Sequence, residues 1–390
     1  MRITTRSGAG ALLTYCANAH PGETLDDVFD AIRRFAGPIR SELEVEAMAL
    51  GVWLSAAALR ELGGRDGAPR LRDALAREQL FAFTFNGFPF GNFFADVVKH
   101  DVYRPDWSTE SRRDYTHELA HVLAGVLPDD LFEGTISTVP LAHRKLAGSA
   151  TEAEALRNLC RLAEDLARLR DRSGKSIRVC LEPEPGCLLE TTGDALSVFA
   201  EKLPEIALRG GFSTEAVFHQ IALCFDTCHQ AVAFETAEES LAALSRAMVP
   251  VAKVQLSNAV SIPDPRDPDA RAALERLDEP RFLHQVRARR SDGSIAGVDD
   301  IDAVAELPDD RPWRAHFHVP IHRDRLAELE TTRGFLEDAA RVLADRTEIP
   351  HLEVETYTWT ALPHGDRPDG DAELIAGIAD ELRFARGLVS

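Results

Sequence analysis

Short apolar runs alternate with longer helical stretches along the whole chain of 390 residues. The runs are rich in β-branched and aromatic residues and lie near 12–16, 47–54, 80–85, 134–139, 177–181, 220–225, 249–256 and 351–355. The clearest helices are expected over 24–35, 56–62, 150–170 and 372–386. Strands that alternate with helices pair in parallel, and eight such units close into a barrel. The pattern therefore predicts an α/β fold, a closed (β/α)8 TIM barrel, with an open doubly wound sheet as the alternative.

One long segment before the last strand does not fit the regular unit. About a hundred residues separate Gln255 from Glu355, far more than one loop and one helix need. A Pro- and Asp-rich piece at 262–269 and a ninth apolar run at 315–321 lie within it. We expect a single TIM-barrel domain over 1–390, with an elaborated loop at about 258–322 that carries its own extended segment over the mouth of the barrel.

Charge and composition exclude several classes of protein. The formal net charge is −20, so the summed field repels phosphate and argues against a nucleic-acid groove or an anionic membrane surface. No apolar run approaches the roughly 20 residues that cross a bilayer. Six cysteines in so long a chain do not make a disulfide scaffold. We therefore expect a soluble, cytoplasmic enzyme or binder without nucleic acid and without membrane insertion.

Acidic residues end three of the expected strands. Glu182, Asp226 and Glu355 each terminate an apolar run, and active sites of barrels form at the carboxyl ends of the strands. Carboxylates that converge there repel one another unless a cation lies between them. Oxygen-rich sites suit Mg²⁺ or Mn²⁺, and Zn²⁺ or Co²⁺ when an imidazole joins. Glu184 and Glu353 share the parity of their neighbours, so the ligand is alternatively one step away.

The same strand ends carry a family resemblance. Leu181-Glu182-Pro183, Phe225-Asp226-x-x-His229 and Val354-Glu355-Thr356 resemble the metal-binding strand ends of xylose-isomerase-like TIM barrels, a superfamily of sugar isomerases, 3-epimerases and inosose dehydratases. A resemblance over nearly the full length is to the EboE family of metabolite traffic proteins, which are described as sugar-isomerase-like barrels. It is carried by segments 13–23, 84–91, 99–107 and 283–285.

The resemblance implies one divalent metal ion (Mn, Mg, Zn or Co) bound by Glu182, Asp226 and Glu355. A histidine is the fourth ligand in the epimerase-like members, and Gln255 stands at that place here. Gln255 binds through its amide oxygen, or else His316 or His318 from the long segment completes the shell.

The resemblance also assigns roles in a reaction on a small polyhydroxylated carbonyl compound. Glu182 and Glu355 are the expected acid and base of an isomerase or epimerase, and His229 is the expected imidazole beside the substrate. Substrate hydroxyls are expected to meet His20, Asn86, His284 and His318. A sugar-like or polyol substrate is the expected partner, and a homodimer is compatible with this interpretation.

Two other functions stay open. Gln255 in place of the histidine suggests a non-catalytic metabolite binder or carrier on the same barrel. His117-Glu118-x-x-His121 matches the zinc-peptidase pattern, in which two imidazoles share one helix face. These histidines fall outside the apolar stripe of their helix, so a solvated helix face is the favoured interpretation.

Overall fold

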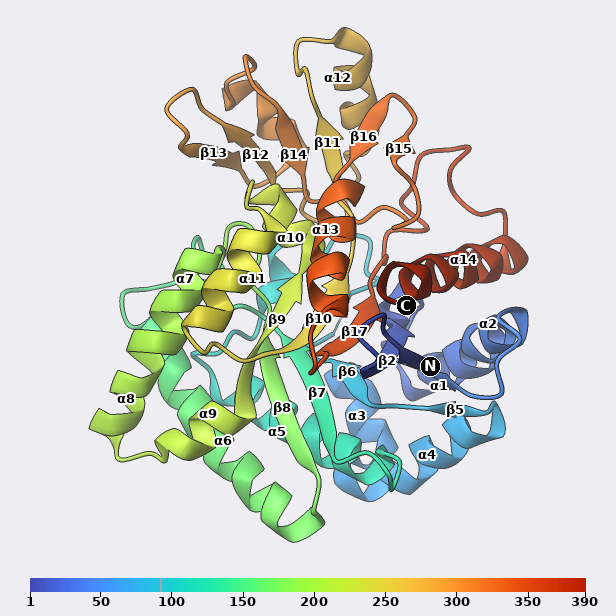
Figure 1. The fold of residues 1–390 in the computed structure, drawn as a ribbon, viewed down its shortest axis with the longest axis vertical. Helices are drawn as coiled ribbons and strands as arrows, with labels where there is room; N and C mark the ends of the chain where they lie inside the picture. The colour runs from blue at the N-terminus through green and yellow to red at the C-terminus, as the bar shows by residue number, and fades with distance from the viewer. Residues whose placement is uncertain (92) are drawn as a thin grey trace.

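The computed structural model describes residues 1–91 and 93–390. Its main sheet has nine strands in the order β1-β2-β17-β10-β9-β8-β7-β6-β4 (Figure 1). The strands are β1 (Arg2–Thr4), β2 (Gly10–Tyr15), β4 (Val52–Trp53), β6 (Thr84–Asn86), β7 (Glu133–Thr138), β8 (Ser176–Leu181), β9 (Ile221–Asp226), β10 (Val251–Leu256) and β17 (His351–Val354). β1 is antiparallel to β2, and every other neighbouring pair is parallel. The predicted α/β class with a parallel sheet is confirmed.

The sheet curls until its two ends touch. The Gly51 amide donates to the Tyr15 carbonyl oxygen at 3.0 Å, and the Ala17 amide donates to the Gly51 carbonyl oxygen at 2.8 Å. These bonds join the end of β2 to the chain just before β4. The carboxyl ends of the parallel strands therefore surround one space, as a site at the mouth of a barrel requires.

Two of the expected strands are each split in two. The 47–54 run gives β3 (Met48–Ala49) and β4, and the 80–85 run gives β5 (Leu80–Phe81) and β6. β3 and β5 form a separate two-stranded sheet, while β4 and β6 enter the main sheet. The break at Gly51 makes room for the Glu353 carboxylate, one oxygen of which would lie 1.7 Å from a Cβ at this position.

Helices cover the outside of the sheet (Figure 1). They are α1 (Leu25–Ala31), α2 (Gly37–Glu42), α3 (Ala56–Leu62), α4 (Ala68–Arg77), α5 (Glu110–Val126), α6 (Thr151–Ser173), α7 (Thr192–Leu196), α8 (Leu203–Gly210), α9 (Thr214–Gln220), α10 (Thr227–Val232), α11 (Ala237–Arg246), α13 (Arg333–Ala344) and α14 (Asp371–Val389). The expected helices over 56–62, 150–170 and 372–386 correspond to α3, α6 and α14. The expected helix over 24–35 is interrupted by a π-helical turn between α1 and α2.

The long segment before the last strand forms a second sheet. Its six strands have the order β13-β12-β14-β11-β16-β15, and Figure 1 shows them as a layer at one end of the molecule. They are β11 (Val260–Ile262), β12 (Val286–Arg289), β13 (Ile295–Val298), β14 (Trp313–Ala315), β15 (Arg325–Leu326) and β16 (Leu329–Thr331), with α12 (Pro268–Glu275) between the first two. All of its paired strands are antiparallel. We call residues 260–331 the inserted sheet.

The expectation of an extended run at 315–321 is wrong beyond its first residue. β14 ends at Ala315, and the following residues are irregular. The His316 amide bonds to the Gln285 carbonyl oxygen, whereas the Val319 amide bonds to that of Asn258. The Phe317 amide bonds to the Ala315 carbonyl oxygen at 2.9 Å, so the chain turns within the run itself and the strand ends there.

Among the residues that the structure describes, no helix combines the length and apolarity that a membrane span requires.

Candidate functional site

A cavity lies at the carboxyl ends of the parallel strands and is closed on one side by the inserted sheet. Its polar lining comes from the ends of the strands and the chain after them, from the inserted sheet and from the 3-10 helix Lys99–Tyr103. The polar residues are Asn18, Asn86, Lys99, Tyr103, Glu182, Glu184, His229, His316, His318 and Glu355. Its apolar lining includes Phe93, Phe282 and Tyr357, whose rings pack edge to face or tilted against one another. A cavity lined by polar groups on one side and aromatic rings on the other suits a small ligand with hydroxyl groups.

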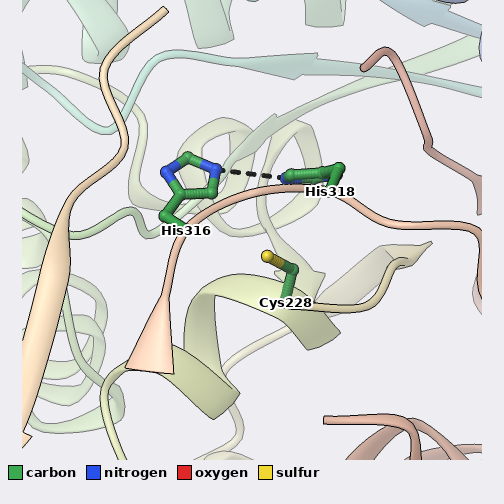
Figure 2. A group of neighbouring side chains, drawn as sticks. All are labelled: Cys228, His316 and His318. Atoms are coloured by element: carbon green, nitrogen blue, oxygen red, sulfur yellow. Dashed lines mark hydrogen bonds between the residues drawn. The ribbon is translucent and has the colours of Figure 1, made fainter. Parts of the chain in front are cut away.

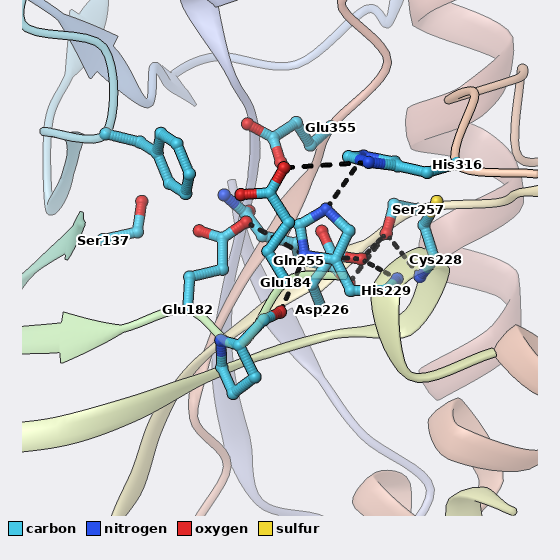
Figure 3. A network of polar contacts seen from close by, with 12 residues as sticks. Ser137, Glu182, Glu184, Asp226, Cys228, His229, Gln255, Ser257, His316 and Glu355 are labelled. Atoms are coloured by element: carbon cyan, nitrogen blue, oxygen red, sulfur yellow. Dashed lines mark hydrogen bonds and ion pairs between the residues drawn. The ribbon is translucent and has the colours of Figure 1, made fainter. Parts of the chain in front are cut away.

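Three of the predicted residues meet at the bottom of this cavity. Glu182 follows β8, Asp226 ends β9 and Glu355 follows β17. Each offers a carboxylate oxygen, and these oxygens all lie within 4.8 Å of one another (Figure 3). All three side chains are buried. We call this group the carboxylate cluster.

The strand register explains why these residues meet. Gln255 on β10 lies beside Asp226 on one side and Glu353 on the other. The ladder continues past the strand ends, since the Glu355 amide bonds to the Leu256 carbonyl oxygen. In this register Glu182 stands two residues before the level of Asp226, and Glu355 stands two residues after it. The three residues therefore have the same parity, and their side chains point to the same side of the sheet.

Burial without a counter-charge perturbs the acids of the carboxylate cluster. Burial, and then the charges of Glu355 and Asp226, raise the pKa of Glu182 well above its usual range. Burial, and then Asp226, raise the pKa of Glu355 to about 8. Glu182 Oε2 and Asp226 Oδ2 have no hydrogen-bond partner. Unpartnered buried carboxylate oxygens that face one another are the donor set that a hard divalent cation needs.

Gln255 also fits a place beside a cation. Its side chain is fully buried, and neither its amide oxygen nor its amide nitrogen has a hydrogen-bond partner. A buried amide without partners is costly in an apolar setting. The predicted use of the amide oxygen as a ligand is compatible with this position and stays a prediction.

The two alternative acids have other partners. Glu353 forms an ion pair with Lys253 at 2.7 Å, and both side chains are fully buried. Glu184 accepts a hydrogen bond from the Tyr103 hydroxyl at 2.8 Å and lies 3.7 Å from His316. Glu353 is therefore already neutralised, whereas Glu184 faces the cavity and the histidines.

His229 lies against the carboxylate cluster, and its expected role beside the substrate stays a prediction. Asp226 caps α10 by accepting the His229 amide at 2.9 Å, which turns the imidazole back toward the strand ends. The His229 Nδ1 atom lies 3.8 Å from Glu182 Oε1 and 3.9 Å from Asp226 Oδ1. The same nitrogen donates to the Pro183 carbonyl oxygen at 2.9 Å.

Two of the four expected substrate contacts line the cavity. Asn86 donates to Glu355 Oε1 at 2.8 Å, and Asn18 donates to the same oxygen at 2.8 Å. His318 lines the cavity from the irregular chain after β14. Asn18 stands within the 13–23 segment that the sequence singled out, but a role at this carboxylate was not expected.

His20 and His284 are not among the residues that line this cavity, and their expected contacts with substrate stay predictions. His20 stacks on Phe35 with ring centroids 4.2 Å apart, and its pKa is lowered to about 3 by burial. His284 is buried between Glu279 and the His316 carbonyl oxygen. Both imidazoles are therefore held by contacts with neighbouring protein groups.

The sequence signal for a zinc peptidase lies on α5, away from the cavity. The His117 and His121 rings are 4.8 Å apart and half-buried. Glu118, the expected base, is held by both the guanidinium and the amide of Arg65. Within residues 1–91 and 93–390, this pair belongs to no group of three neighbouring His, Cys, Asp or Glu side chains.

The raised pKa values predict how stability depends on pH when no divalent ion is bound. Glu184 and Glu355 both have pKa values of about 8 in the folded chain, against 4.5 when exposed. The folded state then keeps protons that the unfolded state has lost, so the free energy of unfolding falls as pH rises toward 8. Buried histidines such as His318, whose pKa is lowered to about 4, have the opposite effect. Between pH 4 and 6.5 they make the free energy of unfolding rise with pH, because the unfolded state binds the proton more tightly.

We therefore expect the free energy of unfolding to fall between pH 6.5 and 8 in EDTA, by up to about 1.4 kcal/mol per pH unit for each carboxyl. An ion bound at the carboxylate cluster favours the ionised form of Glu355, so the part of the fall that Glu355 contributes should vanish when Mn²⁺ is added, while the part from Glu184 remains. Urea unfolding at four pH values, with EDTA and with Mn²⁺, measures both slopes. Equal slopes in the two series would show that no ion binds these acids.

No protein-family model and no curated protein matches the sequence, so the resemblance to the EboE family stays a prediction. Among solved structures, a xylose isomerase domain protein from Planctomyces limnophilus is 13% identical, with 90% of each chain covered and a TM-score of 0.48. A xylose isomerase domain containing protein from Salmonella typhimurium LT2 is 11% identical, covering 99% of this chain and 98% of that chain, with a TM-score of 0.41. D-allulose 3-epimerase from Methylomonas sp., solved with D-allulose, is 15% identical, covering 72% of this chain and 85% of that chain, with a TM-score of 0.39. All three are similar to this chain over more than two thirds of its length.

Proposed function

We propose that this chain is a single-domain, xylose-isomerase-like TIM barrel of the EboE family and a metal-dependent isomerase or epimerase of a small polyhydroxylated carbonyl compound. The observation that carries the proposal is the meeting of Glu182, Asp226 and Glu355 within 4.8 Å beside a cavity. The bonds between Tyr15, Gly51 and Ala17 support a closed eight-stranded barrel around them.

A divalent ion fits the donors that converge there. Glu182, Asp226 and Glu355 would hold it through carboxylate oxygens, and Gln255 would add its amide oxygen. Such an ion stabilises negative charge that develops on a substrate oxygen and lets neighbouring carboxylates stay ionised. Oxygen donors alone favour Mg²⁺ or Mn²⁺ over softer ions.

The chain itself positions a proton acceptor on each side of the substrate. Glu182 and Glu355 stand on separate strands, and Glu355 Oε1 is fixed by two amide donors from Asn18 and Asn86. The other oxygen of Glu355 is left to take a proton from a carbon next to the substrate carbonyl. For an epimerisation Glu182 must start protonated: it gives its proton to the opposite face of the same carbon while Glu355 keeps the proton it removed, and exchange with solvent restores both acids.

The walls of the cavity set the size and polarity of the substrate. Phe93, Phe282 and Tyr357 form the apolar side, which excludes water from a carbanionic intermediate. Asn86 and His318 are placed to bind hydroxyl groups on the polar side. A short sugar or cyclitol with a carbonyl group matches both sides.

Proton exchange with solvent tests the proposal directly. Mn²⁺-loaded protein in D₂O, incubated with D-allulose, D-fructose and a set of inososes, is expected to place deuterium on the carbon next to the carbonyl of at least one compound, as read by NMR. Glu355→Gln is expected to lower the exchange rate at least 10³-fold by removing the proton acceptor. Glu337→Gln on the exposed side of α13 serves as the matched control.

The same experiment separates an enzyme from a carrier. A compound that binds in the cavity without exchange at any carbon would favour the carrier, which the weaker ligand at Gln255 suggests. Absence of both binding and exchange over the whole set would contradict the proposed substrate class.

A further inference from the structure

Three buried histidines stand beside the carboxylate cluster and face one another. His229 comes from α10, and His316 and His318 come from the irregular chain after β14. His316 Nε2 lies 3.1 Å from His229 Nε2 and 3.1 Å from His318 Nε2. All three residues are at least 97% buried. We call them the imidazole cluster.

The other ring nitrogen of each histidine is committed as a donor. His229 Nδ1 faces the Pro183 carbonyl oxygen at 2.9 Å, and His318 Nδ1 faces the Glu355 carbonyl oxygen at 2.8 Å. A carbonyl oxygen can only accept a hydrogen bond, so both Nδ1 atoms carry the proton.

His316 is fixed in the same way through a side chain. Its Nδ1 lies 2.6 Å from Gln285 Oε1. The Gln285 amide nitrogen donates to the Pro185 carbonyl oxygen at 3.1 Å, which determines which end of the amide faces His316. The Gln285 oxygen therefore accepts, and His316 Nδ1 carries the proton.

The three Nε2 atoms are consequently bare acceptors. Two nitrogen lone pairs 3.1 Å apart repel each other, and neither can donate a hydrogen bond to the other. A metal ion removes this conflict, because neutral imidazole with its second nitrogen bonded to an oxygen is the usual form of a histidine ligand. Zn–N distances of about 2.0–2.1 Å place two ligand nitrogens about 3.3 Å apart in a tetrahedral site.

We propose that His229, His316 and His318 bind a second divalent cation through their Nε2 atoms, separate from the ion of the carboxylate cluster. Nitrogen donors select Zn²⁺ or Co²⁺ over Mg²⁺. The nearest further donors are Cys228 (Figure 2), Glu184 and Asp226, since each lies within 4.8 Å of two of these histidines in the groups they form. Asp226 is also a member of the carboxylate cluster, so the two ions would be neighbours.

The second ion would also join two parts of the chain. His229 belongs to the main barrel, while His316 and His318 lead out of the inserted sheet. Binding would therefore hold the inserted sheet over the cavity. The inference does not depend on proton transfer by Glu182 and Glu355. It does assign His318 Nε2 to the ion instead of to a substrate hydroxyl, because His318 Nδ1 already faces the Glu355 carbonyl oxygen.

Zinc stoichiometry tests the inference on the whole chain. Protein stripped with a chelator, saturated with Zn²⁺ and desalted is expected to hold about two ions per chain by elemental analysis. His316→Gln and His318→Gln should each lower this to about one, and Glu182→Gln should remove the other ion only. His117→Gln on α5 is the matched control and should leave the content unchanged.

A second measurement needs no variant. Co²⁺ titrated into the stripped wild-type protein is expected to give the intense visible absorption of a tetrahedral nitrogen-ligated site, and His316→Gln should lose it. The inference would be overturned if the wild type held one zinc ion per chain and showed no such absorption with Co²⁺. The short distances between the Nε2 atoms would then be explained by a proton shared between the imidazoles. If the protein binds two zinc ions but places no deuterium in any of the test compounds in D₂O, the proposed function is contradicted and the second metal site is not.

Discussion

Asp226→Asn is expected to weaken divalent-ion binding at the carboxylate cluster by more than about 100-fold, because changes to residues that only orient metal ligands already cost 10–100-fold. Asp226 is a fully buried member of the cluster, and its Oδ2 has no hydrogen-bond partner. Proton exchange into any substrate should fall with ion occupancy. Titration of stripped protein with Mn²⁺, followed calorimetrically, measures the change in Kd.

The amide replacement keeps the structural tasks of Asp226. Its Oδ1 accepts the His229 amide at 2.9 Å as the cap of α10 and the Ser257 hydroxyl at 2.7 Å. Asparagine caps helices as well as aspartate does, and its side-chain oxygen can accept both bonds. The variant therefore changes the charge while it preserves the local hydrogen bonds.

The stability of Asp226→Asn should change in opposite directions with and without the ion. Without it, removal of one buried charge relieves the repulsion on Glu182 and Glu355, so the stripped variant should unfold at a higher temperature than the stripped wild type. With Mn²⁺ the wild type should be the more stable of the two. Asp267→Asn, at the exposed cap of α12, is the matched control. A variant that binds Mn²⁺ as tightly as the wild type would remove the proposed metal site.

The carboxylate cluster could be expected from the sequence because a charge at the end of a buried strand needs a partner. Asp226 follows five apolar residues, and Glu355 ends the last strand. Once the strands are taken as parallel, their carboxyl ends must meet at one edge. The α/β class and the convergence of these acids therefore depend on local pattern and on strand order, both of which a sequence displays.

The roles of the histidines and the strands of the inserted sheet could not be predicted from the sequence. An imidazole serves equally well as a ligand, a hydrogen-bond donor or a packed ring, so His20 and His318 look alike in sequence although only His318 reaches the cavity. The inserted sheet is built from strands of two to four residues. Runs this short carry too little alternation to be distinguished from a loop.

Lys253 gave no signal of its own in the sequence, yet its replacement is expected to have the largest effect on folding. The side chain on β10 is fully buried, with its Nζ 2.7 Å from Glu353 and 3.0 Å from the Ser137 hydroxyl. Burial alone lowers the pKa of Lys253, but Glu353 raises it above its usual value, so the lysine stays charged. Lys253→Met should lower the free energy of unfolding by about 3–5 kcal/mol, because it leaves Glu353 buried without a counter-charge. Urea unfolding at pH 7.5 measures the loss.

A double variant shows whether this loss comes from the stranded charge or from the lysine stem. Lys253→Met combined with Glu353→Leu should regain most of the stability, because replacing a buried pair by apolar groups of similar size is often neutral. The exposed pair of Arg276 and Glu328, 2.6 Å apart, is the matched control, and Arg276→Met should cost less than about 1 kcal/mol. If the double variant is as unstable as Lys253→Met, the lysine supports the barrel through packing and its bond to Ser137. If it recovers, Lys253 neutralises the innermost acid, and the charge of Glu182, Asp226 and Glu355 is left for a cation from solution.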